Sequence, residues 1–189
     1  MCGVHCIEHP CGRPTRGTPA LRACKTGTDL NMEANENRLA YIAALIETAL
    51  AVGLDGADWA NRYGLAWLSD AYNGIGPERW PPELRAKVTN WLHIFEPASL
   101  IHDAETTESD GMRKAFYEAN ARFLVNCLKL ANWWYPWYSW KRYRARAIAH
   151  VLFECVNGDQ GWNSWQRAHR KRLEAATASG QRQEGETNA

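Results

Sequence analysis

Several features that would settle the class of a protein are missing from this sequence. It has no apolar run long enough to cross a bilayer, and nothing near its N-terminus resembles the apolar core of a secretory signal. Its formal net charge is only +1, so no overall basic field points to nucleic acid as a partner. It also lacks the alternating pattern of strands and any internal repeat. These absences predict an all-α protein that stays in the cytoplasm.

Cysteine is scarce in most of the chain and crowded in one part of it. Cys127 and Cys155 lie on apolar faces of predicted helices, and we expect two buried thiols rather than a disulfide. Residues 1–31 hold the other cysteines, with His5 and His9, at positions Cys2, Cys6, Cys11 and Cys24. These are zinc-ligand types, but the spacing is not that of paired Cys-x-x-Cys motifs. We favour two other interpretations over a zinc knuckle. Residues 1–31 are either a disordered leader or upstream sequence that precedes a true start at Met32.

The strongest positive signal is apolar spacing between Pro97 and Leu130. One face recurs at steps of three and four residues in the second half of this segment, at Phe116, Ala119, Phe123, Cys127 and Leu130. Pro97 suits a first helical turn, and Ser109, Asp110 and Gly111 are typical turn residues. We therefore predict two antiparallel helices joined by a short polar turn.

Further helices are predicted on both sides of this pair. The first would end at Gly53 and bury Leu39, Ile42, Leu45, Ile46 and Leu50. Asp55 or Asp58 would cap the next, which carries Trp59, Tyr63, Trp67 and Leu68 towards the core. Others are expected over residues 80–95, 145–156 and 160–178. The sequence thus predicts one small all-α domain over residues 32–178, with the antiparallel pair at its centre, and a disordered tail at 179–189.

Ten tryptophans are many for a chain of 189 residues, and several lie among tyrosines and basic residues between positions 133 and 146. The interpretation that we rank first is a helix connection broken by Pro136, with the rings packed in the core and the arginines in solvent. The second is a membrane interface, where rings lie at headgroup depth and cations meet anionic lipid. The third and weakest is stacking on single-stranded nucleic acid.

Two separated segments carry the residues that are best suited to catalysis or to cation binding. The loop from Asn73 to Pro77 contains two glycines, which let a backbone turn tightly and present carbonyl oxygens to one point, and such oxygens are normal ligands of Ca²⁺. Some twenty-five residues later, His102 and Asp103 are adjacent on a predicted helix. An imidazole is a base near neutral pH, and a carboxylate binds a hard cation. Because helix neighbours point about 100° apart, the two would serve different partners around one site.

Taken in order, these segments resemble the phospholipase A2-like proteins encoded by phages and prophages. The matching residues are Asn73-Gly74-Ile75-Gly76-Pro77, Trp80, Pro82, Ala98, His102-Asp103, Ala119-Asn120, Phe123-Leu124 and Asn126-Cys127-Leu128. The resemblance covers about Tyr72 to Trp162. It implies a phospholipase A2-like fold, a bacterial host cytoplasm or a virion as the location, and a phospholipid or membrane surface as the partner, with virion components as a further partner.

The resemblance also implies Ca²⁺-dependent hydrolysis of phospholipid esters. His102 would be the general base that activates a water molecule. Asp103 and the backbone carbonyls of Gly74 and Gly76 would hold Ca²⁺, which would polarise the ester carbonyl.

Four positions depart from the family pattern. Ile75 and Ser99 stand where the family has paired cysteines, and Thr106 stands where it has an aromatic residue. Asn120 replaces the aspartate that orients the imidazole, a change that lowers the rate of a triad enzyme by ~10⁴. Glu105, on the same helix as the histidine, would be a substitute source of negative charge. The alternative function is therefore a non-catalytic phage protein of the same fold that binds a membrane or a virion partner.

Overall fold

The computed structural model describes the backbone of residues 27–76 and 80–187 and the side chains of residues 35–76 and 80–178. Within these ranges all regular structure is helical, which confirms the predicted class. We find no helix there that is long and apolar enough to span a membrane. The cysteine-rich segment, on which the zinc and leader interpretations rest, lies almost entirely outside the described residues.

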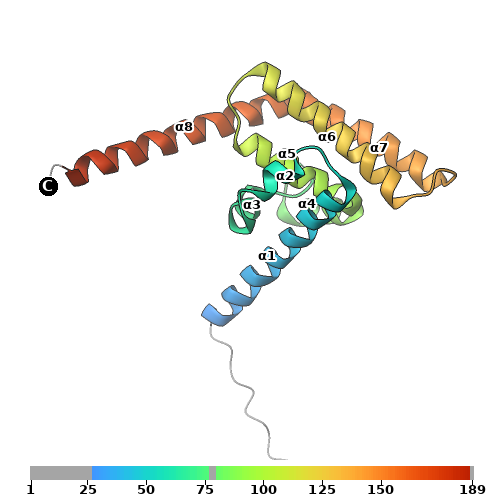
Figure 1. Ribbon diagram of the computed structural model, residues 1–189, viewed down its shortest axis with the longest axis horizontal. Coiled ribbons are helices and arrows are strands. Elements are labelled where there is room, and N and C mark those ends of the chain that lie inside the picture. The colour runs from blue at the N-terminus through green and yellow to red at the C-terminus, as the bar shows by residue number, and fades with distance from the viewer. Residues whose placement is uncertain (1–26, 77–79, 188–189) are drawn as a thin grey trace, which may run out of the picture.

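Helix α5 occupies the centre of the molecule (Figure 1). Helices α1, α2, α3, α6 and α8 contact it, and α6 packs extensively against α7 to form a long antiparallel hairpin. The order along the chain is α1 (Gly27–Val52), α2 (Ala57–Asn61), α3 (Leu65–Ala71), α4 (Pro82–Trp91), the 3₁₀ turn η1 (His93–Phe95), α5 (Glu96–Thr107), α6 (Arg113–Trp134), α7 (Trp140–Asn157) and α8 (Asp159–Thr187).

The predicted central pair of helices is present as α5 and α6. The turn between them is held by side chains, since Ser109 Oγ accepts from the Gly111 N–H at 3.2 Å and Asp110 Oδ1 accepts from the Met112 N–H at 2.8 Å. Gly111 has a φ of +74°, a left-handed conformation that favours glycine. All five residues of the predicted apolar face on α6 are buried. The prediction for this segment is therefore confirmed.

Helix α1 begins before Met32 and ends where the sequence predicts. Gly53 has a φ of +69°, and the N–H groups of Gly53 and Leu54 donate to the carbonyls of Leu50 and Ala49. This is the Schellman arrangement, in which a left-handed glycine satisfies the last carbonyls of a helix. The predicted core position Leu50 is wrong: its side chain is 37% exposed, and Ala49 on the adjoining face is fully buried instead.

The single helix expected after α1 is in fact two short ones. Gly64, with a φ of +81°, separates α2 from α3, and Gly56 rather than an aspartate precedes α2, without a side-chain cap. Asp55 instead exchanges backbone hydrogen bonds with the Asn126 side chain on α6, at 2.8 and 2.9 Å. Tyr63, which was predicted to face the core, is 38% exposed.

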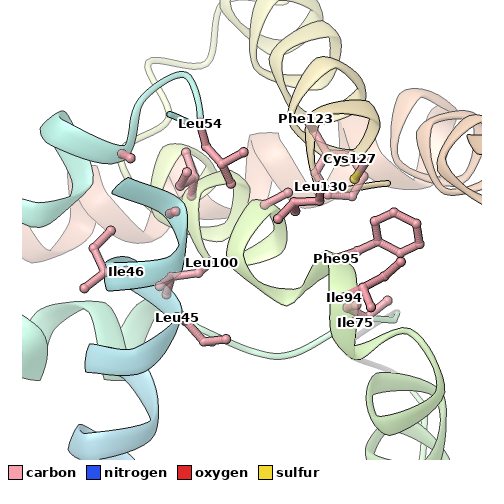
Figure 2. Packing of buried hydrophobic residues seen from close by; sticks show 14 of the residues in the cluster. Leu45, Ile46, Leu54, Ile75, Ile94, Phe95, Leu100, Phe123, Cys127 and Leu130 are labelled. Carbon is pink, nitrogen blue, oxygen red and sulfur yellow. The ribbon is translucent and has the colours of Figure 1, made fainter. Parts of the chain in front are cut away.

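One main hydrophobic cluster joins α1, η1, α5, α6 and the loop that holds Gly74 and Gly76, which we call the glycine loop. Figure 2 shows Leu45 and Ile46 of α1 on one side of Leu100, with Phe123, Cys127 and Leu130 of α6 nearby. A smaller cluster joins the start of α6 to α8 through Phe116, Ala119, Trp162 and Trp165.

The C-terminal third corrects three predictions. The predicted helix connection at Pro136 is present between α6 and α7, but most aromatic rings between residues 133 and 143 are in solvent, so their predicted place in the core is wrong. Cys155 is exposed, whereas Cys127 is buried and both thiols are free. Helix α8 continues to Thr187 instead of ending near Ala178 before a disordered tail.

Candidate functional site

The glycine loop after α3 is fastened to α4 by a threonine that sequence analysis missed. Thr89 Oγ1 accepts from the Ile75 N–H at 3.0 Å and lies 3.4 Å from the Ile75 carbonyl oxygen. Gly74 and Gly76 have φ angles of +80° and +123°, and a Cβ on Gly74 would lie 3.1 Å from Thr89 Oγ1. Ile75 itself is buried in the main core. The loop is therefore shaped by its glycines and held by contacts on both sides.

Asp103 lies directly against this loop. The backbone N–H of Asn73 donates to Asp103 Oδ2 at 3.0 Å, which joins two segments thirty residues apart. Burial raises the pKa of the Asp103 carboxyl to about 7, while the Asn73 N–H and the positive charge of Arg85 act in the opposite direction. The expected meeting of the loop with the His-Asp helix is thus present at Asp103.

His102 faces α6 rather than the loop. Its Nε2 lies 2.8 Å from Asn120 Oδ1, and its ring packs against the ring of Phe123 at a centroid distance of 5.0 Å. The Asn120 amide nitrogen is turned away, towards Asn157 Oδ1 at 3.2 Å and the Val156 carbonyl at 3.5 Å.

These contacts fix the protonation of the imidazole. An amide oxygen can only accept, so His102 Nε2 carries the proton and donates it to Asn120 Oδ1, and Nδ1 of the neutral ring holds the lone pair. Burial lowers the pKa of His102, which favours the neutral ring, while the bond to Asn120 acts in the opposite direction. Asn120 therefore holds the His102 ring through Nε2.

Glu105 does not take the role suggested for it. Its carboxylate forms an ion pair with Arg122 of α6, with Nε and Oε1 2.6 Å apart, and it faces the neighbouring turn of that helix. Burial raises the pKa of Glu105 to about 7 in spite of Arg122. Thr106, at the position of the family's aromatic residue, donates its hydroxyl to the His102 backbone carbonyl at 2.9 Å. Charge near the imidazole is therefore not supplied by Glu105.

A pocket of about 370 Å³ opens beside the loop, between α1, α4 and the start of α5. Asn73, Arg85 and Glu96 contribute to its lining, whereas His102 and Asp103 are absent from it as far as the described residues extend. Glu96 is buried there, and the hydroxyls of Tyr41 and Tyr72 both donate to its Oε2. Burial beside this carboxylate raises the pKa of both tyrosines. Sequence analysis missed this cluster, because nothing in the spacing of the three residues marks it.

The donor set for a cation is small. Among residues 35–76 and 80–178, no three His, Cys, Asp or Glu side chains gather closely enough to hold a metal ion. The carboxylate that the structure places against the loop is that of Asp103, and its printed contact there is with the Asn73 N–H. Carboxylate and backbone carbonyl oxygens are ligand types that Ca²⁺ accepts, and Asp103 with the loop supplies both types.

Comparison with family models, with curated proteins and with solved structures found no match to this chain.

Proposed function

We propose that the protein is a Ca²⁺-dependent hydrolase of phospholipid esters, of the phospholipase A2 type. One observation carries the proposal: two adjacent residues of α5 have separate, complementary partners. His102 is oriented by an amide on α6, and Asp103 is bound to the glycine loop. A proton acceptor and a carboxylate are thereby held side by side on one rigid helix, which is what a water-activating hydrolase requires.

The proton transfers follow from the protonation of the ring. His102 Nδ1 has no hydrogen-bond partner among the described residues, so its lone pair is open to a water molecule. That water would lose a proton to Nδ1 as its oxygen attacks the ester carbonyl carbon. When the ester C–O bond breaks, the leaving alkoxide would take the proton from Nδ1. Asn120 holds the ring in the required orientation throughout, and no covalent enzyme intermediate is needed.

Asp103 and the carbonyls of Gly74 and Gly76 would hold the calcium ion. When bound, Ca²⁺ supplies Lewis-acid polarisation of the ester carbonyl. Since the pKa of Asp103 is raised to about 7, its carboxylate is fully ionised only above that pH. Calcium affinity should therefore rise as the pH increases through 7, and a site with a single carboxylate should be weak.

One observation favours a second candidate, a non-catalytic protein of the same fold that binds a membrane or a virion partner. The group that orients the imidazole is neutral, so it offers no charge to stabilise an imidazolium. In a triad enzyme the equivalent change reduces the rate by ~10⁴. A hydrolase with this neutral group should be slow, whereas a protein selected only for binding would tolerate an asparagine at this position.

Release of fatty acid from phospholipid vesicles tests the proposal. We expect slow release by the wild-type protein that requires Ca²⁺, and its loss in His102→Gln and in Asp103→Asn. His150→Gln is the matched control, because this histidine is exposed on α7 away from the site. Release that is equal in wild type and His102→Gln would reject the assigned base. Calcium binding without any release would favour the second candidate.

A further inference from the structure

Six aromatic side chains surround the turn at the far end of the α6–α7 hairpin, and about half to three-quarters of each is exposed. They are Trp133 at 62%, Trp134 at 49%, Trp137 at 74%, Tyr138 at 71%, Trp140 at 77% and Tyr143 at 57%. We call residues 133–143 the aromatic tip. Figure 1 shows that this end of the hairpin projects away from α5 and from the end of α8. Soluble proteins rarely leave so much contiguous apolar surface in water unless it binds something.

The charge around the aromatic tip has one sign. Between Glu118 and Glu154 the sequence contains no acidic residue. The basic residues of this interval are Arg122, Lys129, Lys141, Arg142, Arg144 and Arg146. The first two are paired with carboxylates from other elements.

The four basic residues at the start of α7 have no carboxylate partner in the part of the chain that the structure describes. Arg146 donates to the Asn132 side chain, and the Arg144 guanidinium lies 5.8 Å from the Trp91 ring centre. Lys141 is exposed at the beginning of the helix. The opposite end of α6 is different, because four carboxylates line a second pocket there, those of Glu105, Glu108, Asp110 and Glu118. The hairpin is therefore polarised, with uncompensated positive charge beside the aromatic rings.

We infer that the aromatic tip is a docking surface for anionic lipid bilayers. Tryptophan and tyrosine favour the headgroup region, where an apolar ring and a polar N–H or O–H are both satisfied. Neighbouring lysine and arginine are drawn to anionic headgroups, and each contributes about fivefold to affinity. A projecting end reaches a flat surface, whereas single-stranded nucleic acid is bound in a groove that follows its backbone. This inference is independent of the hydrolase proposal, since it uses none of the residues of that site.

Vesicle binding in calcium-free buffer tests the docking surface. The full chain is mixed with vesicles of phosphatidylcholine alone or of an equal mixture with phosphatidylglycerol, and bound protein is measured by co-sedimentation and by quenching of tryptophan by brominated lipid. We expect binding to the anionic vesicles only, weakened by added salt. Trp137→Ala with Trp140→Ala should reduce affinity by roughly tenfold or more. Lys141→Glu with Arg144→Glu should abolish binding.

Matched controls lie at exposed positions elsewhere. Leu173→Ala on α8 and Lys114→Glu at the start of α6 should bind as the wild type does. His102→Gln should also bind normally, so failure of the hydrolase proposal would leave this one standing. Equal affinity for neutral and anionic vesicles, or no effect of the tip variants, would overturn it. So would tip-dependent binding to a single-stranded oligonucleotide instead of lipid, or a dimer in solution that the tip variants dissociate.

Discussion

Replacing Asn120 with aspartate should convert a neutral orienting group into a charged one with little movement. The Asn120 Oδ1 to His102 Nε2 distance is 2.8 Å, already within the range of charge-assisted hydrogen bonds. The new carboxylate would therefore stabilise the imidazolium that forms when Nδ1 takes a proton from water. It should also raise the pKa of His102.

The substitution should change both the rate of hydrolysis and the free energy of unfolding. In a triad enzyme the difference between aspartate and asparagine is ~10⁴ in rate, which is an upper bound for the gain here. Against it, the position is fully buried, and the amide nitrogen now donates to Asn157 Oδ1 at 3.2 Å. Asn157 would have to rotate its amide to donate in return, and we expect a loss of about 1–3 kcal/mol in unfolding free energy. The variant should hydrolyse ten- to thousandfold faster, and should be less stable.

Three measurements decide the outcome: fatty-acid release with Ca²⁺, the pKa of His102 by NMR, and unfolding in urea. Asn126→Asp is the control, because this asparagine is also buried on α6 but bonds the Asp55 backbone instead. It should lose stability without gaining activity. If Asn120→Asp folds and raises the pKa of His102 while hydrolysis does not increase, His102 is not the base.

Two further predictions concern stability. Because burial raises the pKa of Asp103 from 3.8 to about 7, the folded state holds this proton more tightly than the unfolded chain, and the resulting stability is lost as the pH rises from about 4 to about 7. Asp103→Asn should therefore melt above the wild type at pH ~8, with a smaller difference below pH ~4; a lower melting temperature at high pH would contradict this assignment. Gly111→Ala should lower the free energy of unfolding by more than the ~1–2 kcal/mol of a left-handed alanine, since its Cβ would lie 2.6 Å from the His169 ring. Gly53→Ala, at a left-handed φ of +69° with no atom within 4 Å of the added Cβ, isolates the backbone part, and equal losses in urea unfolding would refute the role of the contact.

Local signals in the sequence predicted the helices well where several of them agreed. The α5–α6 pair combines a proline in a first turn, a cluster of turn residues and a regular apolar face, and all three are present in the structure. The prediction was wrong where one signal competed with another. Between Trp59 and Leu68 the apolar spacing favoured one helix, but Gly64 adopts a positive φ and divides it.

The contacts of the candidate site were harder to predict, because they depend on tertiary placement. The resemblance led to His102, Asp103, the glycine loop and Asn120. In the structure Asp103 contacts the loop, and His102 separately contacts Asn120. The spacing of Glu105 on the histidine's helix gave no sign of Arg122, which binds its carboxylate from α6. The sequence also did not decide between a buried and an exposed aromatic tip, since a tryptophan-rich segment has the same composition in a core and on a surface.

Buried polar groups are not by themselves a sign of chemistry in this molecule. Glu96 and Tyr72 are buried too, yet the hydroxyls of Tyr41 and Tyr72 both donate to one carboxylate oxygen of Glu96 and stabilise its charge. At His102 the arrangement is different: one ring nitrogen is held by Asn120, and no described residue bonds the other. His102 is only partly buried, and its Nδ1 is not among the buried polar atoms that lack a partner, so water can reach it. A water-accessible Nδ1 is what a general base needs, and it supports the hydrolase proposal more directly than burial or the raised pKa of Asp103 alone.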